Sequence, residues 1–63
     1  MSKQIQQYTV KADRETGEWV EEAKHVGVVE LSAWHAKQDT AEAHFDTYEF
    51  EGETRAIEVV WID

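Results

Sequence analysis

The final segment, residues 55–63, constrains the fold most, because it reads as a β-strand that is apolar on both faces. A strand of this kind normally lies between two covering layers. A short chain supplies one layer easily, so the second face is either covered with difficulty or kept for a partner. Alternate residues share a face: Ile57, Val59 and Trp61 on one side, and Ala56, Glu58, Val60 and Ile62 on the other.

The size of the chain predicts one small domain, 1–63, of marginal stability, because 63 residues bury a modest share of their surface. There is no cysteine, which excludes disulfides and thiolate metal sites. Three Trp, two Tyr and two Phe can supply a compact core instead. The chain starts without an apolar run of signal-peptide or membrane-spanning length, so we expect a cytoplasmic protein that does not bind a membrane.

The charge balance is strongly acidic, with 14 Asp and Glu against 6 Lys and Arg and a net charge of −8. Direct nucleic-acid binding needs Lys and Arg to replace the counterions of the phosphates, so we do not expect it here. The acidic balance favours association with basic surfaces. The carboxylates are dispersed along the chain, which argues against a disordered acidic tail.

The first half of the chain carries strand and turn signals. Residues 5–12 alternate between apolar and polar and predict a half-buried strand. Residues 13–17 predict a turn that ends on a glycine, and 19–24 the returning strand of a hairpin. Gly27 marks a bulge or a bend before a further apolar segment, 28–31.

Two helix positions fit the middle of the chain. In the first, Ser32 caps a long helix over residues 33–48. In the second, Asp39 caps a shorter helix over 40–50, which the capping-box pattern Asp-Thr-Ala-Glu favours. Both helices would bury one apolar stripe, made of Ala41, Phe45 and Tyr48.

These elements predict an α+β domain with a small antiparallel sheet of three to four strands and one helix packed on one face. The order is strand, strand, an optional third strand, helix, strand. Gly52 would end the helix in the left-handed conformation. The last strand would lie beside the first, with the helix over Val59 and its neighbours on that face. Val60 and Ile62 would then point away from the helix.

This order of elements resembles that of the small phage-encoded inhibitors of host RNA polymerase. The features that carry the resemblance are the hairpin, the bent strand that leads into the helix start Asp39-Thr40-Ala41-Glu42-Ala43, and the terminal strand. The resemblance covers most of the chain as an order of elements. It carries no functional residue across. The small size, the acidity and the lack of a catalytic constellation are compatible with a phage or mobile-element accessory protein that binds and modulates a host protein.

The sequence predicts no catalytic or cofactor chemistry. His25, His35 and His44 occur in none of the spacings that bind metal ions, and no glycine-rich phosphate loop is present. The serines stand in no triad or nucleophile-elbow pattern. We therefore expect neither an enzyme nor a bound cofactor or metal.

The aromatic residues give the better functional hypothesis, because a domain this small has difficulty burying three indoles. We expect a small acidic protein-interaction module whose partner is another protein, with a basic surface, or a second copy of the chain. One alternative is an acidic mimic of nucleic acid that blocks a DNA- or RNA-binding protein. Another is a structural homodimer that pairs through the C-terminal strand. The expected partner-binding residues are Trp19, Trp34, Glu58, Val60 and Ile62.

Overall fold

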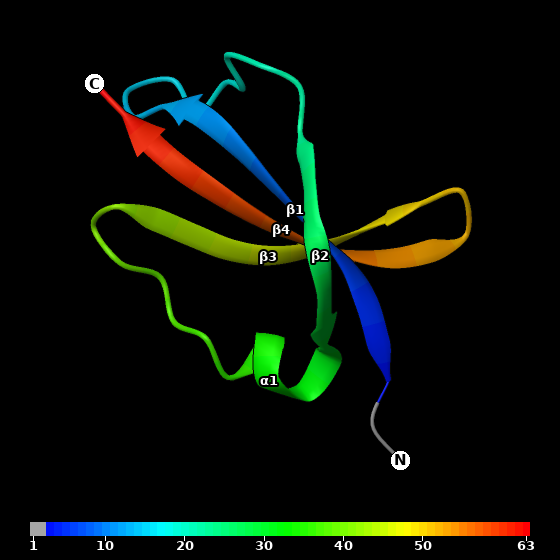
Figure 1. Cartoon of the computed structure of the whole chain (residues 1–63). Helices are drawn as coiled ribbons and strands as arrows, with labels where there is room; N and C mark the ends of the chain where they lie inside the picture. Colours follow the sequence, from blue (N-terminus) through cyan, green and yellow to red (C-terminus); the bar gives the residue numbers. More distant parts are fainter. Residues whose placement is uncertain (1–2) are drawn as a thin grey trace.

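The computed structural model describes residues 3–63 and shows one twisted four-stranded sheet with one short helix (Figure 1). No helix within this range is long and apolar enough to cross a membrane. The strand order is β2-β1-β4-β3. The elements along the chain are β1 (Gln4–Asp13), β2 (Lys24–Glu30), α1 (Leu31–His35), β3 (Ala43–Phe50) and β4 (Glu53–Ile62).

The doubly apolar strand β4 lies in the middle of the sheet, between β1 and β3. The prediction that the last strand lies beside the first is therefore confirmed. The prediction of a purely antiparallel sheet is wrong, because β1 and β4 run parallel, with Val10 opposite Val59. The β1–β2 and β3–β4 pairs are antiparallel, and the connection through α1 carries the chain from one edge of the sheet to the other. Such a crossover makes the two central strands parallel.

Both predicted helices, over 33–48 and over 40–50, are wrong, because residues 43–50 form β3 and the only helix described in residues 3–63 is α1. Asp39 therefore caps no helix, and the neighbouring Thr40 caps a turn in the loop before β3. Thr40 Oγ1 accepts hydrogen bonds from the N–H groups of Glu42 (3.2 Å) and Ala43 (3.1 Å). Asx and hydroxyl side chains cap turns as readily as helices. The resemblance to the phage inhibitors rested on a helix that starts at Asp39, so the structure does not share that order of elements.

The segment expected to end the helix is instead a hairpin turn between β3 and β4. Glu51 and Gly52 have φ values of 52° and 79°, and Phe50 pairs with Glu53. Two successive residues with positive φ define the type I′ turn that connects antiparallel strands closely. The left-handed conformation of Gly52 is confirmed, in a different structural setting.

Each face of β4 has its own cover, and the covers differ from those expected. We call the side of the sheet against which α1 packs the helix face. There Trp34 joins the cluster of Ile5 and Ala56. Since residues alternate, Val60 and Ile62 belong to this helix face, which corrects the prediction that they point away from the helix.

We call the opposite side the open face. It holds a second buried cluster, on which the loop between β1 and β2 folds back through Ala23. The expected returning strand over 19–24 is reduced here to one bridge between Ala12 and Trp19. The next regular strand after β1 is β2, which begins at Lys24. The buried members of the cluster are Val10, Ala12, Ile57 and Val59.

Candidate protein-docking site

A groove with a volume of about 360 Å³ lies on the open face, between the β1–β2 loop and the exposed side of β3 and β4. Its floor is formed by the buried side chains of Ile57 and Val59. Aromatic and polar side chains rise around this floor and remain in contact with solvent. The lining residues are Gly17, Trp19, His44, Asp46, Thr47, Tyr48, Ile57, Val59 and Trp61.

Trp19 reaches the groove because a tight turn folds the chain back after β1. The N–H of Gly17 donates to the carbonyl of Asp13 (2.8 Å), and Gly17 itself takes a positive φ of 76°. The N–H of Val20 then donates to the carbonyl of Lys11 (2.9 Å), which sets the loop beside the end of β1. Trp19 is left 51 % exposed. An indole held by its backbone with half its surface in water is typical of a binding anchor.

β3 and β4 supply the other aromatic walls through the alternation of their side chains. Trp61 follows Val59 by two positions on β4 and shares its face. Tyr48 comes from β3, and both residues are partly buried against the open-face cluster. Because these rings stand on paired strands, their positions are fixed by the sheet rather than by a mobile loop.

The polar rim of the groove centres on His44. Its Nδ1 lies 2.6 Å from Asp39 Oδ2, and its Nε2 lies 3.6 Å from Asp46 Oδ2. The hydrogen bond with Asp39 raises the pKa of His44, and the charge of Asp46 adds to the effect. The pKa of Asp39 is lowered, first by the N–H of Phe45 and then by His44. The ring of His44 is tilted by 30° against Trp61, with 6.4 Å between the centroids.

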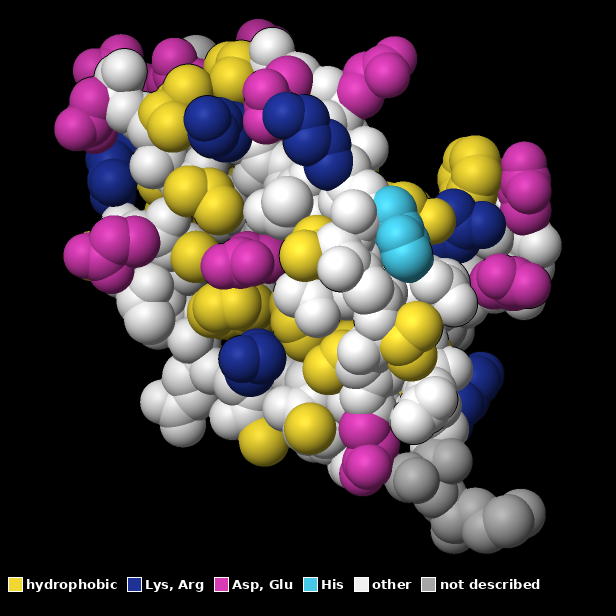
Figure 2. Space-filling view, in the orientation of Figure 1, with side chains coloured by type: hydrophobic (Ala, Val, Ile, Leu, Met, Phe, Trp, Pro, Cys, Tyr) yellow, Lys and Arg dark blue, Asp and Glu magenta, His cyan; other side chains and the backbone are white. Residues whose placement is uncertain are grey.

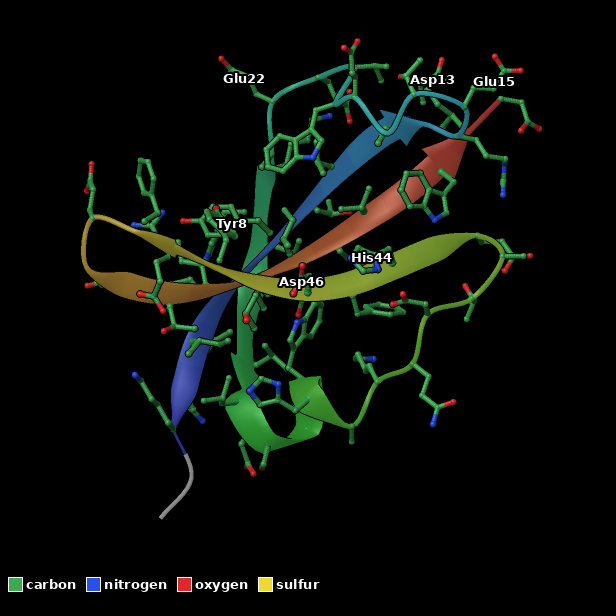
Figure 3. All side chains as sticks on the ribbon, turned by 180° about the vertical axis from the view of Figure 1, so that it is seen from behind. Tyr8, Asp13, Glu15, Glu22, His44 and Asp46 are labelled. Atoms are coloured by element: carbon green, nitrogen blue, oxygen red, sulfur yellow. The ribbon has the colours of Figure 1, made fainter. Side chains whose placement is uncertain are left out.

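The surroundings of the groove are acidic. The loop that carries Trp19 also contains Glu15, Glu18, Glu21 and Glu22. Figure 2 shows carboxylates gathered at the loop end of the molecule, and Figure 3 shows Glu15 and Glu22 above the strand that bears His44 and Asp46. No Lys or Arg is among the lining residues of this groove. A cationic partner would therefore meet an attractive field on approach.

The structure does not bring the five expected partner-binding residues together. Trp19 lies in the groove, as described. Trp34 is 2 % exposed and belongs to the core under α1, so it offers no surface to a partner. The remaining three are partly buried on the opposite, helix face. They are Glu58, Val60 and Ile62.

Of the nine lining residues, only Trp19 was expected to bind a partner. The missed aromatic and ionisable side chains are four, mainly because 43–50 was assigned to a helix. As a strand, this segment places His44, Asp46 and Tyr48 on one face. The fourth, Trp61, was expected beneath the helix. The signal that was available was the strand-favouring composition of 43–50 followed by Glu-Gly, which is typical of a strand that enters a tight hairpin.

Aspartate side chains occupy the outer edge of β3. The N–H of Phe45 donates to Asp39 Oδ1 (3.0 Å), and the N–H of Thr47 donates to Asp46 Oδ1 (2.8 Å). Both groups lie on the side of β3 that has no neighbouring strand. Side-chain capping of this kind hinders pairing with another chain, as inward-turned charges do on many natural edge strands.

The other edge, β2, contains a bulge. Gln7 pairs with Gly27 and Tyr8 with His25, so Val26 has no opposite residue on β1. This agrees with the bulge or bend predicted at Gly27. A bulge twists an edge and interrupts its regular ladder. β4 is paired with β1 from Ala56 to Ile62 and with β3 from Glu53 to Val60, so little of its backbone edge is left for pairing with a second copy.

No protein-family model, curated protein or solved structure matches the chain. Within residues 3–63, no three His, Asp or Glu side chains converge as a set that could hold a metal ion. The candidate site is therefore defined by its own geometry: an aromatic groove with an acidic rim.

Proposed function

We propose that the protein is a small non-catalytic interaction module that docks on a basic segment of another protein through the groove on its open face. The observation that supports this best is Trp19, whose backbone is fixed by the turn while its indole stays 51 % exposed beside an apolar floor. Exposed aromatic anchors next to a pocket supply most of the affinity in many interfaces.

The chemistry of the partner follows from the charges around the groove. The net charge is −8, the loop above the groove is acidic, and the lining carries Asp46 but no Lys or Arg. Burial of an apolar contact on the floor would provide affinity, while the carboxylates would speed association and exclude acidic partners. A partner with alternating apolar and basic side chains fits both parts of the groove.

Capture from an extract of the organism that encodes the chain tests the proposal, with three immobilised forms compared: wild type, Trp19→Ala and Phe50→Ala. Phe50 is a matched control, since it is 49 % exposed and lies outside the groove. We expect one basic protein to be retained by the wild type and by Phe50→Ala and to be lost from Trp19→Ala. Equal retention on all three would contradict the proposal.

A second candidate function is mimicry of nucleic acid, which the acidic β1–β2 loop favours through its four glutamates in residues 15–22. A mimic would bind a nucleic-acid-binding protein almost entirely through charge, so its affinity would fall steeply as salt rises. Docking in the groove would lose less affinity, because the apolar contact persists at high salt. Repeating the capture at high salt separates these two functions.

A further inference from the structure

We propose that the anchor of the partner is a single arginine side chain, held in the groove against the indoles of Trp19 and Trp61 with its guanidinium at Asp46, and that the proton on His44 competes with it. This inference rests on the proposed function and names the group that the site would recognise. The proposed ligand of the groove is therefore a planar cation at the end of an apolar stem.

The corner of the groove between Asp46 and Trp61 has the chemistry that such a cation needs. Asp46 is 64 % exposed, and its Oδ1 is engaged by the N–H of Thr47 (2.8 Å). Its Oδ2 is 3.6 Å from His44, longer than a good hydrogen bond, and so remains able to accept one. A guanidinium pairs well with carboxylates and also lies favourably over tryptophan rings.

His44 shows that this wall of the groove already accommodates a planar ring that can carry positive charge. The imidazole lies near Trp61 with a small tilt of 30° and near Asp46 with its Nε2. When protonated, it neutralises part of the charge that would attract the arginine. When neutral, it leaves Asp46 to the incoming guanidinium. The two cations thus compete for the same carboxylate.

The charged groups around His44 come from two elements. The loop before β3 contributes Asp39, and β3 contributes Asp46, each within ion-pair distance. β4, which packs against the other side of β3, places Val59 and Trp61 next to the imidazole. Its one cation on this face, Arg55, is held over the rings of Tyr8 and Phe50.

The probe for the test is the blocked peptide acetyl-Gly-Leu-Arg-Leu-Gly-amide, together with the same peptide carrying citrulline in place of arginine. Citrulline keeps the shape of the side chain and removes its charge. Binding is followed by NMR of the three indole N–H groups at several pH values. We expect the signals of Trp19 and Trp61 to move, with a Kd of about 1 mM. Trp34, which is 2 % exposed, is the internal control.

We expect citrulline to weaken binding about tenfold, and the affinity for arginine to rise about two- to fivefold as the pH passes upward through the titration of His44. Arginine keeps its charge throughout this range. His44→Gln should bind at the high-pH level at every pH. Asp46→Asn should weaken the affinity for the arginine peptide about fivefold. Glu49→Gln removes a charge from the same strand outside the groove, and it should change this affinity little.

Equal binding of the arginine and citrulline peptides, or a pH dependence that survives in His44→Gln, would overturn the inference. The proposed function would still stand if the captured partner required Trp19. Conversely, arginine binding in the groove together with a partner that ignores Trp19→Ala would overturn the proposed function alone.

Discussion

The indole Nε1 of Trp34 donates a hydrogen bond of 2.7 Å to the backbone carbonyl of Asp46. The bond joins α1, on the helix face, to the strand whose opposite side lines the groove. Trp34 also packs edge-to-face on Phe45, with 5.4 Å between ring centroids. The short helix therefore supports the groove from behind, although it contributes none of its lining residues.

We expect Trp34→Phe to destabilise the fold by about 1–2 kcal/mol, since the hydrogen bond and part of the packing are lost. Trp34→Ala should cost about 3–5 kcal/mol, which is most of the stability of a domain this size. Urea unfolding followed by circular dichroism measures both. The control is Trp19→Ala, which should cost less than about 1 kcal/mol because Trp19 is half exposed. Similar losses for Trp34→Ala and Trp19→Ala would contradict this description of the core.

The hairpin turn offers a stabilising substitution. Glu51 has a φ of 52°, a conformation that strains most side chains and that Asn adopts more easily. We expect Glu51→Asn to raise stability by about 0.5–1 kcal/mol and Gly52→Ala to lower it by about 1 kcal/mol. Thermal unfolding measures both. A Glu51→Asn variant less stable than the wild type would show that the turn is not type I′ in solution.

The pair formed by His44 and Asp39 predicts a window of pH in which it stabilises the fold. The pKa of His44 is raised from 6.5, so its contribution is complete below pH 6.5 and is lost as the pH rises through the higher folded value. The pKa of Asp39 is lowered from 3.8, so its contribution is complete above pH 3.8 and is lost on acidification through the lower folded value. The difference in unfolding midpoint between wild type and His44→Gln should thus be largest between these two pH values. A difference that does not vary with pH would contradict the pairing.

The capped edge of β3 predicts the oligomeric state. We expect the wild type to sediment as a monomer, because the side chains of Asp39 and Asp46 hold two outward N–H groups. The double variant Asp39→Ala/Asp46→Ala should self-associate. Its control is Glu49→Ala/Glu51→Ala, which changes the net charge equally without uncovering the edge. If both double variants associate equally, the self-association is caused by the lost charge and not by the exposed backbone of β3.

The sequence predicted the parts of the fold that depend on local alternation. The strand over 5–12 and the turn at Gly17 follow from patterns of apolar residues and glycine. The position of the last strand beside the first was predicted as the simplest arrangement of the elements, and it is confirmed. The parallel pairing of β1 and β4 could not be read in the same way. The pairing is parallel because the connection from β2 to β3 ends at the far edge of the sheet. Tertiary packing, and not a local sequence pattern, determines at which edge this connection ends.

The error over residues 40–50 arose because two signals conflicted. Thr40 accepts the N–H of Ala43, three residues on, as a helix cap does, whereas Asp39 accepts the N–H of Phe45, six residues on. The stripe of Ala41, Phe45 and Tyr48 also has helical spacing. In the structure Phe45 and Tyr48 pack on opposite faces of the sheet, each in its own cluster. Phe45 and Tyr48 are three residues apart, which places them on one side of a helix but on opposite sides of a strand. If both sides of the strand are buried, this spacing does not distinguish a strand from a helix.

The groove was only partly predictable for the same reason. Trp19 was recognised because three indoles are too many for a small core. The polar rim at His44 and Asp46 depended on the strand assignment. Glu58, Val60 and Ile62 were chosen because the helix was expected on the other side of β4, and the structure places α1 on their side.

The most direct test of the docking groove is the affinity of the captured partner, once purified, for Trp19→Ala and for Phe50→Ala by calorimetry. The two side chains are 51 % and 49 % exposed, so each truncation shortens an aromatic side chain of which about half is in contact with solvent. We predict a loss of at least about tenfold in affinity for Trp19→Ala and a change within about twofold for Phe50→Ala. Equal effects of the two substitutions would contradict the assignment of the groove as the docking site.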